Sequence, residues 1–170
     1  MLDFDVVTMD MVVMTLIIHN EADRMLYWGD RLSQALNVDL ERRFAVYGVT
    51  PAQFRLLAAL ARRDADTVRG LAAALRLDGA AVTRLADRLQ AKGLVRREPD
   101  LTDGRSVRLS LSEEGVELVP LLDAEASAHE RDWFGPLSYS ELRQYKLTLA
   151  KLLQRTGSGP DEVWLRRDLQ

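Results

Sequence analysis

Hydrophobic residues recur at roughly helical spacing from Asn20 to Val46 and again after the Thr50-Pro51 pair. That pair supplies an N-cap and a proline for the first helical position, so a second helix is expected to begin there. Its expected buried face comprises Phe54, Leu56, Leu57, Leu60 and Ala61. Two shorter helices should follow, one carrying Val68 to Leu75 and one running from about Ala80 to Lys92, where Gly93 ends it.

The period of the pattern then changes. Leu94 to Glu98 is extended in character, Pro99 to Gly104 is rich in turn residues, and Arg105 to Leu111 alternates apolar and polar side chains. This pattern predicts a two-stranded hairpin with a polar tip.

The rest of the chain predicts two more helices. The first is capped by Ser112 and ended by Gly135-Pro136, and the second runs from about Tyr139 to Leu153. The whole pattern predicts a mainly α fold with a small β-hairpin wing, in which a winged helix-turn-helix is flanked by long helices. Such flanking helices suggest an interface between two copies of the chain.

The formal net charge is −3, but the charge is unevenly distributed. Residues 62–108 hold 11 Lys and Arg against 7 Asp and Glu, whereas the segments before and after them are net acidic. A balance of +4 over the predicted short helices and hairpin suits contacts with phosphate groups. The acidity of the whole chain therefore does not argue against nucleic acid as a partner.

The composition excludes several kinds of chemistry. With no cysteine, the chain cannot form a disulfide framework, a thiolate zinc site or a thiol redox switch. His19 and His129 are far apart, and no nucleotide-binding glycine loop or nucleophile–histidine–acid set occurs, so no enzyme, metal or cofactor is expected. The apolar run from Val6 to Ile18 is too short for a membrane span and follows acids rather than basic residues, so we expect a cytoplasmic protein.

The fourth predicted helix has an apolar face and a polar face. The face expected to pack inward carries Val82, Leu85, Ala86 and Leu89. On or beside the outward face lie Ala80, Thr83, Arg84, Asp87 and Arg88. Arginine suits guanine in the major groove because its paired donors match two acceptors, and threonine can contact a phosphate or a base methyl. The alternative is an ordinary solvated helix surface.

The expected hairpin tip favours the first interpretation. Asp103-Gly104-Arg105-Ser106 places an arginine on a protruding turn, beside an acid that can hold its guanidinium. A protruding arginine suits a narrow minor groove, where negative potential is concentrated. A lone turn of this kind is ordinary, but here it follows closely on a helix that bears Arg84 and Arg88.

The segment from Leu71 to Gly115 resembles the core of MarR-type winged helix-turn-helix transcriptional regulators. The matching motifs are Tyr47-Gly-Val-Thr-Pro51-Ala-Gln-Phe54, Val82-Thr83-Arg84, Leu89-Gln-Ala-Lys-Gly93-Leu94-Val95, Asp103-Gly-Arg105-Ser106 and Leu111-Ser-Glu-Glu-Gly115. The resemblance holds from about Asn20 to Leu153. The expected domains are an apolar N-terminal arm over 1–19, a MarR-like domain over 20–155 with 50–111 as DNA-reading head and 20–46 plus 112–155 as dimerisation helices, and a linker and tail over 156–170.

The resemblance implies a sequence-specific regulator of transcription, expected to be a repressor, that binds a pseudo-palindromic site in double-stranded DNA as a homodimer. The expected DNA contacts are Thr83, Arg84 and Arg88 in the major groove, Arg105 oriented by Asp103 in the minor groove, and Ser106 and Arg108 beside them. Ala80 and Ala81 depart from the family, whose members often have hydroxyl residues there. Thr67, Arg96 or Arg108 would then supply the missing phosphate contacts, or the module has lost specific DNA binding and binds a protein instead.

Many members of the family release DNA when a small anionic aromatic molecule occupies a cleft beside the reading head. In this chain the resemblance places that effector pocket near Tyr27, Trp28, Arg31, Phe54 and Arg55. Aromatic rings with arginines can hold a phenolic or other aromatic anion. The alternative is that the rings belong to the core and the arginines are solvated.

The apolar N-terminal arm has two interpretations. As a helix, Leu2 to Ile18 would be apolar nearly all round and therefore buried, most plausibly between subunits. Alternatively, translation starts downstream at Met14 or Met25 and the segment is not native.

Overall fold

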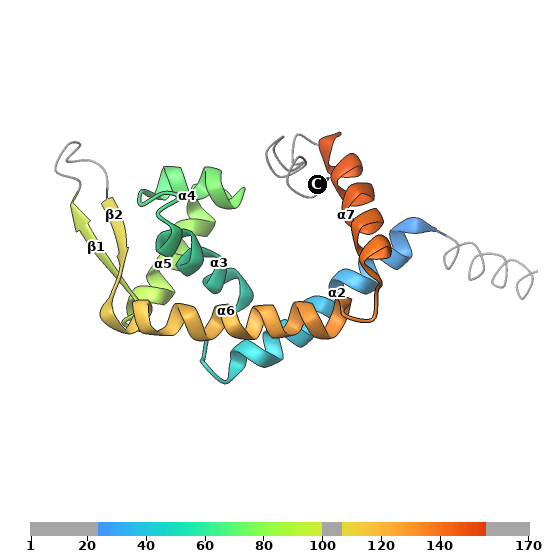
Figure 1. Ribbon diagram of the computed structural model, residues 1–170. Helices are drawn as coiled ribbons and strands as arrows, with labels where there is room; N and C mark the ends of the chain where they lie inside the picture. The colour runs from blue at the N-terminus through green and yellow to red at the C-terminus, as the bar shows by residue number, and fades with distance from the viewer. Residues whose placement is uncertain (1–23, 100–106, 156–170) are drawn as a thin grey trace, which may run out of the picture. The chain divides into compact units, whose positions relative to one another are not determined.

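The computed structural model describes residues 24–99 and 107–155 (Figure 1). The chain divides into two compact units, Met1–Glu125 and Ala126–Gln170. The elements of the first unit are α2 (Met25–Ala45), α3 (Pro51–Arg62), α4 (Val68–Leu75), α5 (Gly79–Ala91), β1 (Val95–Pro99), β2 (Val107–Leu111) and the first part of α6 (Glu113–Phe134). The predicted arm over 1–19, the hairpin tip and the tail over 156–170 lie outside the described residues.

The helices of the reading head begin where the local sequence predicts. Thr50 and Gln53 form a capping box at the start of α3, in which each side chain bonds the other residue's backbone N–H. Thr67 accepts from the Gly70 N–H at the start of α4, and Asp78 accepts from the Ala81 N–H at the start of α5. Each cap satisfies a backbone donor that has no partner within the helix.

Two of these helices end on arginines in the left-handed conformation. Arg63 follows α3 with φ 59°, and Arg76 follows α4 with φ 54°. This region of backbone space favours glycine, because a side chain crowds the carbonyl there. After α5 the corresponding turn uses Gly93, with φ 73°.

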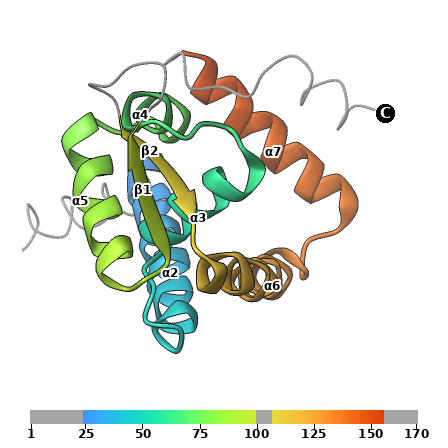
Figure 2. The same cartoon turned by 90° about the vertical axis from the view of Figure 1, so that its left-hand side faces the viewer.

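The core of the first unit lies around α3. Its fully buried side chains include Leu56 and Leu57 of α3, Leu71 of α4, Val82, Ala86 and Leu89 of α5, and Leu109 of β2. The hairpin packs against the same helices, as Figure 2 shows. The predicted burial of Ala61 was wrong, because this residue lies exposed in the last turn of α3, beyond the packed centre of the helix. Phe54 is half-buried and packs edge-on against Phe44.

β1 and β2 form the predicted antiparallel hairpin, with Val95 opposite Leu111 and Arg97 opposite Leu109. The inner strand β2 also pairs with the segment that leads into α4. The Leu109 N–H donates to the Asp66 carbonyl at 2.6 Å, and Thr67 and Arg108 form an isolated bridge. The wing is therefore joined to the helices by backbone hydrogen bonds as well as by buried leucine.

One junction connects the end of α5, both strands and the start of α6. The Ser112 N–H donates to the Leu94 carbonyl, and the Ser112 hydroxyl donates to the Gly93 carbonyl at 2.6 Å while accepting from the Gly115 N–H. A Cβ on Gly115 would lie 2.2 Å from the Leu94 carbonyl oxygen. Residue 115 must therefore be glycine for α6 to begin so close to the hairpin.

The second unit contains the end of α6 and α7 (Tyr139–Gln154). Ser138 and Glu141 form a capping box at the start of α7, and the rings of Phe134 and Tyr145 lie 5.9 Å apart. The Ser138 hydroxyl and the Ser138 backbone N–H both donate to the Glu141 carboxylate. These two hydrogen bonds, the hydroxyl's more strongly, lower the pKa of Glu141 below the ordinary 4.5.

Two negative findings apply to residues 24–99 and 107–155. None of the helices there is both long enough and apolar enough to cross a membrane. No group of His, Cys, Asp or Glu side chains in those ranges could hold a metal ion.

We expect Gly115→Ala to destabilise the fold by about 2–3 kcal/mol, because the new methyl group must displace the backbone at Leu94. Gly29→Ala is the matched control, since Gly29 lies within α2 with open space around it. That control should stabilise the protein by about 0.5–1 kcal/mol. Urea unfolding followed by circular dichroism measures both changes. Equal stabilities for the two variants would contradict the close contact at the junction.

Glu141→Gln should weaken the start of α7 at neutral pH, because a neutral amide accepts the Ser138 hydrogen bonds less strongly than a carboxylate. The pKa of Glu141 is lowered on folding, so its stabilisation is complete above pH 4.5 and is lost as the pH falls through the folded-state pKa. The stability difference between wild type and variant should therefore shrink on acidification. Urea unfolding at several pH values tests this, with Glu117→Gln on α6 as a control for the loss of one surface carboxylate.

Candidate nucleic-acid interface

The outward face of α5 presents the residues predicted to contact DNA. Val82, Ala86 and Leu89 are fully buried, so the opposite face of the helix is turned to solvent. That exposed face carries Thr83, Arg84, Asp87 and Arg88. The helix is thus fixed from behind by its apolar side chains and offers a row of polar groups in front.

Arg84 and Arg88 are available for contacts outside the chain. Both are exposed, and within the described ranges neither forms an ion pair. Thr83 is different, because its hydroxyl donates to the Gly79 carbonyl at 2.8 Å. With its proton used inside the helix, the hydroxyl of the exposed Thr83 can only accept a hydrogen bond from a partner outside the chain.

The three residues predicted to supply further phosphate contacts each have a partner within the protein in this structure. Arg108 pairs with Asp66 at 3.3 Å, and Arg96 lies 3.9 Å from Glu113. Thr67 accepts the capping hydrogen bond of α4. These roles leave any contact of Arg108, Arg96 or Thr67 with DNA as a prediction.

Three predicted residues of the wing, Asp103, Arg105 and Ser106, lie outside the described residues. The minor-groove contact expected from Arg105 therefore stays a prediction.

Sequence reasoning missed Arg97, which bridges the wing and α5. Arg97 Nη2 lies 2.7 Å from Asp87 Oδ1 and donates to the Thr83 carbonyl at 3.4 Å. The alternation of β1 was the available signal, because Arg97 shares a face with the buried Val95, whereas Arg96 faces outward.

Sequence reasoning also missed a polar link between α3 and the end of α5. Gln53 is buried, and its Oε1 accepts from the Thr50 N–H and from Lys92 Nζ at 3.0 Å. Lys92 also donates to the Gly48 carbonyl. A single lysine at the C-cap of α5 thus links the end of this helix to the loop before α3.

The residues predicted for the effector pocket fall into smaller groups. Arg31 stacks over the Tyr27 ring and donates to its hydroxyl at 3.0 Å, and Trp28 packs edge-on against Tyr27 with 57% of its surface exposed. Phe54 packs on Phe44 instead, and Arg55 is exposed. Arg31 is therefore engaged by a neighbouring tyrosine on its own helix.

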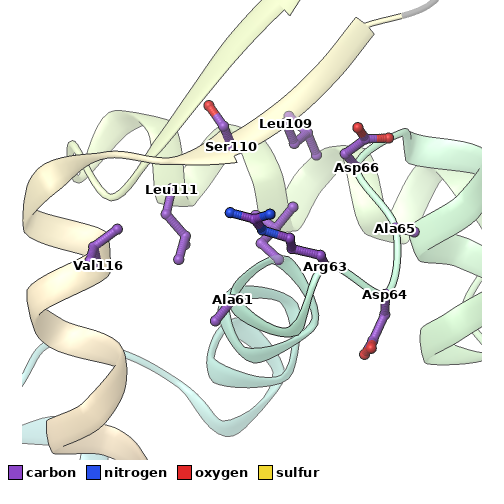
Figure 3. Close-up of a pocket in the computed structure, with 10 residues that line it drawn as sticks. Ala61, Arg63, Asp64, Ala65, Asp66, Leu109, Ser110, Leu111 and Val116 are labelled. Atoms are coloured by element: carbon purple, nitrogen blue, oxygen red, sulfur yellow. The ribbon is translucent and has the colours of Figure 1, made fainter.

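A cavity of about 690 Å³ lies elsewhere in the first unit, between the end of α3, β2 and the start of α6 (Figure 3). Its lining contains none of the predicted effector residues and comprises Leu60, Ala61, Arg63, Asp64, Ala65, Asp66, Leu109, Ser110, Leu111 and Val116. Figure 3 shows the Arg63 guanidinium directed toward Leu111, with the carboxylates of Asp64 and Asp66 turned away from it.

The charges around this cavity do not cancel. Asp64 pairs with Arg62 at 2.9 Å, and Asp66 pairs with Arg108. Arg63 forms no ion pair within the described ranges. The cavity therefore combines an aliphatic lining with one uncompensated positive charge.

α5 is buried on one face, carries exposed arginines on the other and is followed directly by a two-stranded wing. This arrangement defines a winged helix-turn-helix of the DNA-binding class. The comparisons with known proteins agree. The model of the MarR family matches residues 47–106. The transcriptional regulator PecS of Dickeya dadantii is 30% identical over 137 residues, which cover 78% of this chain and 82% of PecS.

Two further relatives support the same assignment. The transcriptional repressor MdtR of Bacillus subtilis is 32% identical over 124 residues, which cover 72% of this chain and 79% of MdtR. The crystal structure of the MepR–DNA complex of S. aureus has a TM-score of 0.74 at 25% identity and covers 78% of this chain and 98% of that one. The chain belongs to the MarR family of transcriptional regulators, and it is a DNA-binding regulator rather than an enzyme.

Proposed function

We propose that the protein is a cytoplasmic homodimer that binds a pseudo-palindromic operator and represses transcription. The observation that carries this proposal is the outward face of α5, where Arg84 and Arg88 are exposed and unpaired within the described ranges. Two such helices related by a twofold axis would enter successive major grooves, with the wings reaching the flanking minor grooves. The repressor role is supported by the similarity to MdtR.

Exposed apolar residues on the outer helices support the homodimer. On α2, Met25 and Leu26 are about four-fifths exposed, and on α7 Leu152 and Leu153 are about half exposed. Large apolar side chains exposed on each of these helices are typical of protein–protein contacts. We therefore propose that 20–46 and 112–155 carry the dimer interface.

An effector is the second part of the proposal, and the cavity beside Arg63 is the observation that favours it. An organic anion could pair with the Arg63 guanidinium and place its apolar body against Leu60, Leu109 and Leu111. Since β2 supplies part of the lining, such a ligand would act on the wing. Arg31, in contrast, already bonds Tyr27.

Selection of bound duplexes from a random pool should yield inverted repeats with half-sites about one helical turn apart. Arg84→Ala and Arg88→Ala should each weaken binding to the selected site by about 1–3 kcal/mol. Arg42→Ala, which removes an exposed arginine of α2, is the control and should retain parental affinity. Parental affinity in both α5 variants would show that this face does not read DNA, and a monomer in sedimentation would contradict the dimer.

Thermal unfolding with an excess of 4-hydroxybenzoate, with phenol as the neutral control, tests the effector. At a hundredfold excess over Kd the acid should stabilise the protein by about 2.7 kcal/mol, which is several degrees in Tm. Arg63→Gln should abolish the shift, whereas Arg62→Gln, next to it but paired with Asp64, should preserve it. A shift that survives in Arg63→Gln and is lost in Arg31→Gln would place the effector at Tyr27 and Trp28 instead.

A further inference from the structure

The exposed face of α5 contains an acid where DNA would demand positive charge. Asp87 lies on the same face as Arg84, which comes three residues earlier in the helix, and Arg88 follows Asp87 directly. An unpaired carboxylate there would repel phosphates, and it could also pair with Arg84 at the i, i+3 spacing and withdraw that arginine from DNA. The structure shows neither arrangement, because Asp87 pairs with Arg97.

Arg97 is placed for this role by the register of the hairpin. It lies opposite Leu109, which is fully buried, so both side chains are on the face of the wing that is turned toward the helices. The Arg97 side chain is 28% exposed and that of Asp87 is 54% exposed. Arg97 is thus the more sheltered partner, held with its stem against the head and its guanidinium at α5.

The same guanidinium also contacts the backbone of the helix. Arg97 Nη2 donates to the Thr83 carbonyl at 3.4 Å as well as pairing with Asp87 at 2.7 Å. In an α-helix the carbonyl of residue 83 points toward residue 87, so both contacts lie at the same place on α5. Arg97 is thus held there by a backbone oxygen as well as by the carboxylate.

We propose that Arg97 is a positioning residue for DNA recognition, which neutralises Asp87 and sets α5 against the wing so that Arg84 and Arg88 face the major groove. This inference rests on the proposed operator binding. It assigns Arg97 no direct contact with DNA. In its absence, Asp87 is free to repel the phosphates or to capture Arg84.

The double-mutant cycle of Asp87→Asn and Arg97→Gln tests this role on the selected operator. Arg97→Gln should weaken binding roughly tenfold, since it leaves Asp87 unpaired, whereas Asp87→Asn should change affinity by less than about threefold. The double variant should bind more tightly than Arg97→Gln, because the harmful carboxylate is gone, and more weakly than Asp87→Asn, because α5 still lacks its link to the wing. Arg62→Gln is the matched control for a lost arginine, since it breaks the exposed ion pair between Arg62 and Asp64 at the end of α3 and should weaken binding only about twofold.

Two results would overturn the proposal. If Arg97→Gln weakens binding equally in the Asp87→Asn background, with a salt dependence reduced by about one phosphate, then Arg97 contacts DNA directly. If Arg97→Gln binds as well as Arg62→Gln does, then the pair of Arg97 and Asp87 has no role in recognition.

A second measurement separates this inference from the proposed function. Amide hydrogen exchange of the free protein should be faster over residues 83–91 in Arg97→Gln than in Arg62→Gln, because α5 has lost its link to the wing. Unchanged exchange there would contradict the positioning role even if the variant binds DNA poorly. A wild-type protein that selects no duplex would contradict the operator proposal instead, and exchange would then decide the role of Arg97 alone.

Discussion

The close approach of α6 to the hairpin is the constraint on which the head depends. Gly115 lies against the Leu94 carbonyl with no room for a side chain, and Ser112 bonds both Leu94 and Gly93. The end of α5, the start of β1, the end of β2 and the start of α6 therefore meet within a few residues of one another. A displacement of any one of these elements must be shared by the other three.

This junction fixes only one end of α5 and of the wing, and Lys92 supports the same end by linking it to Gln53. Away from the junction, Arg97 links β1 to the middle of α5, and Arg108 links β2 to Asp66. Much of the basic charge in the head therefore serves internal geometry. The net charge of +4 over residues 62–108 overstates what is available to a nucleic acid, and Arg84 and Arg88 are among the described arginines there that form no ion pair.

Elements whose signals are local were predictable from the sequence. Thr50, Asp78 and Ser138 cap helices because a hydroxyl or carboxylate before a helix bonds its first amides wherever it occurs. The contacts of Arg97 and Lys92 were not predictable in this way. Arg97 and Asp87 are separated by 10 positions in the sequence, and Lys92 and Gln53 by 39. Only the packing of the strand and helices brings these side chains together.

The effector pocket expected from chemistry and family resemblance at Tyr27, Trp28, Arg31 and Phe54 stays a prediction. The structure adds that Phe54 packs on Phe44 and that Arg31 bonds Tyr27. Arg63, beside the cavity, has a left-handed backbone conformation. Glycine there would relieve about 1 kcal/mol of backbone strain and stabilise the protein, but it would remove the one cation that lines the cavity. Selection for heat resistance alone would therefore be expected to weaken the effector binding that we propose for this cavity.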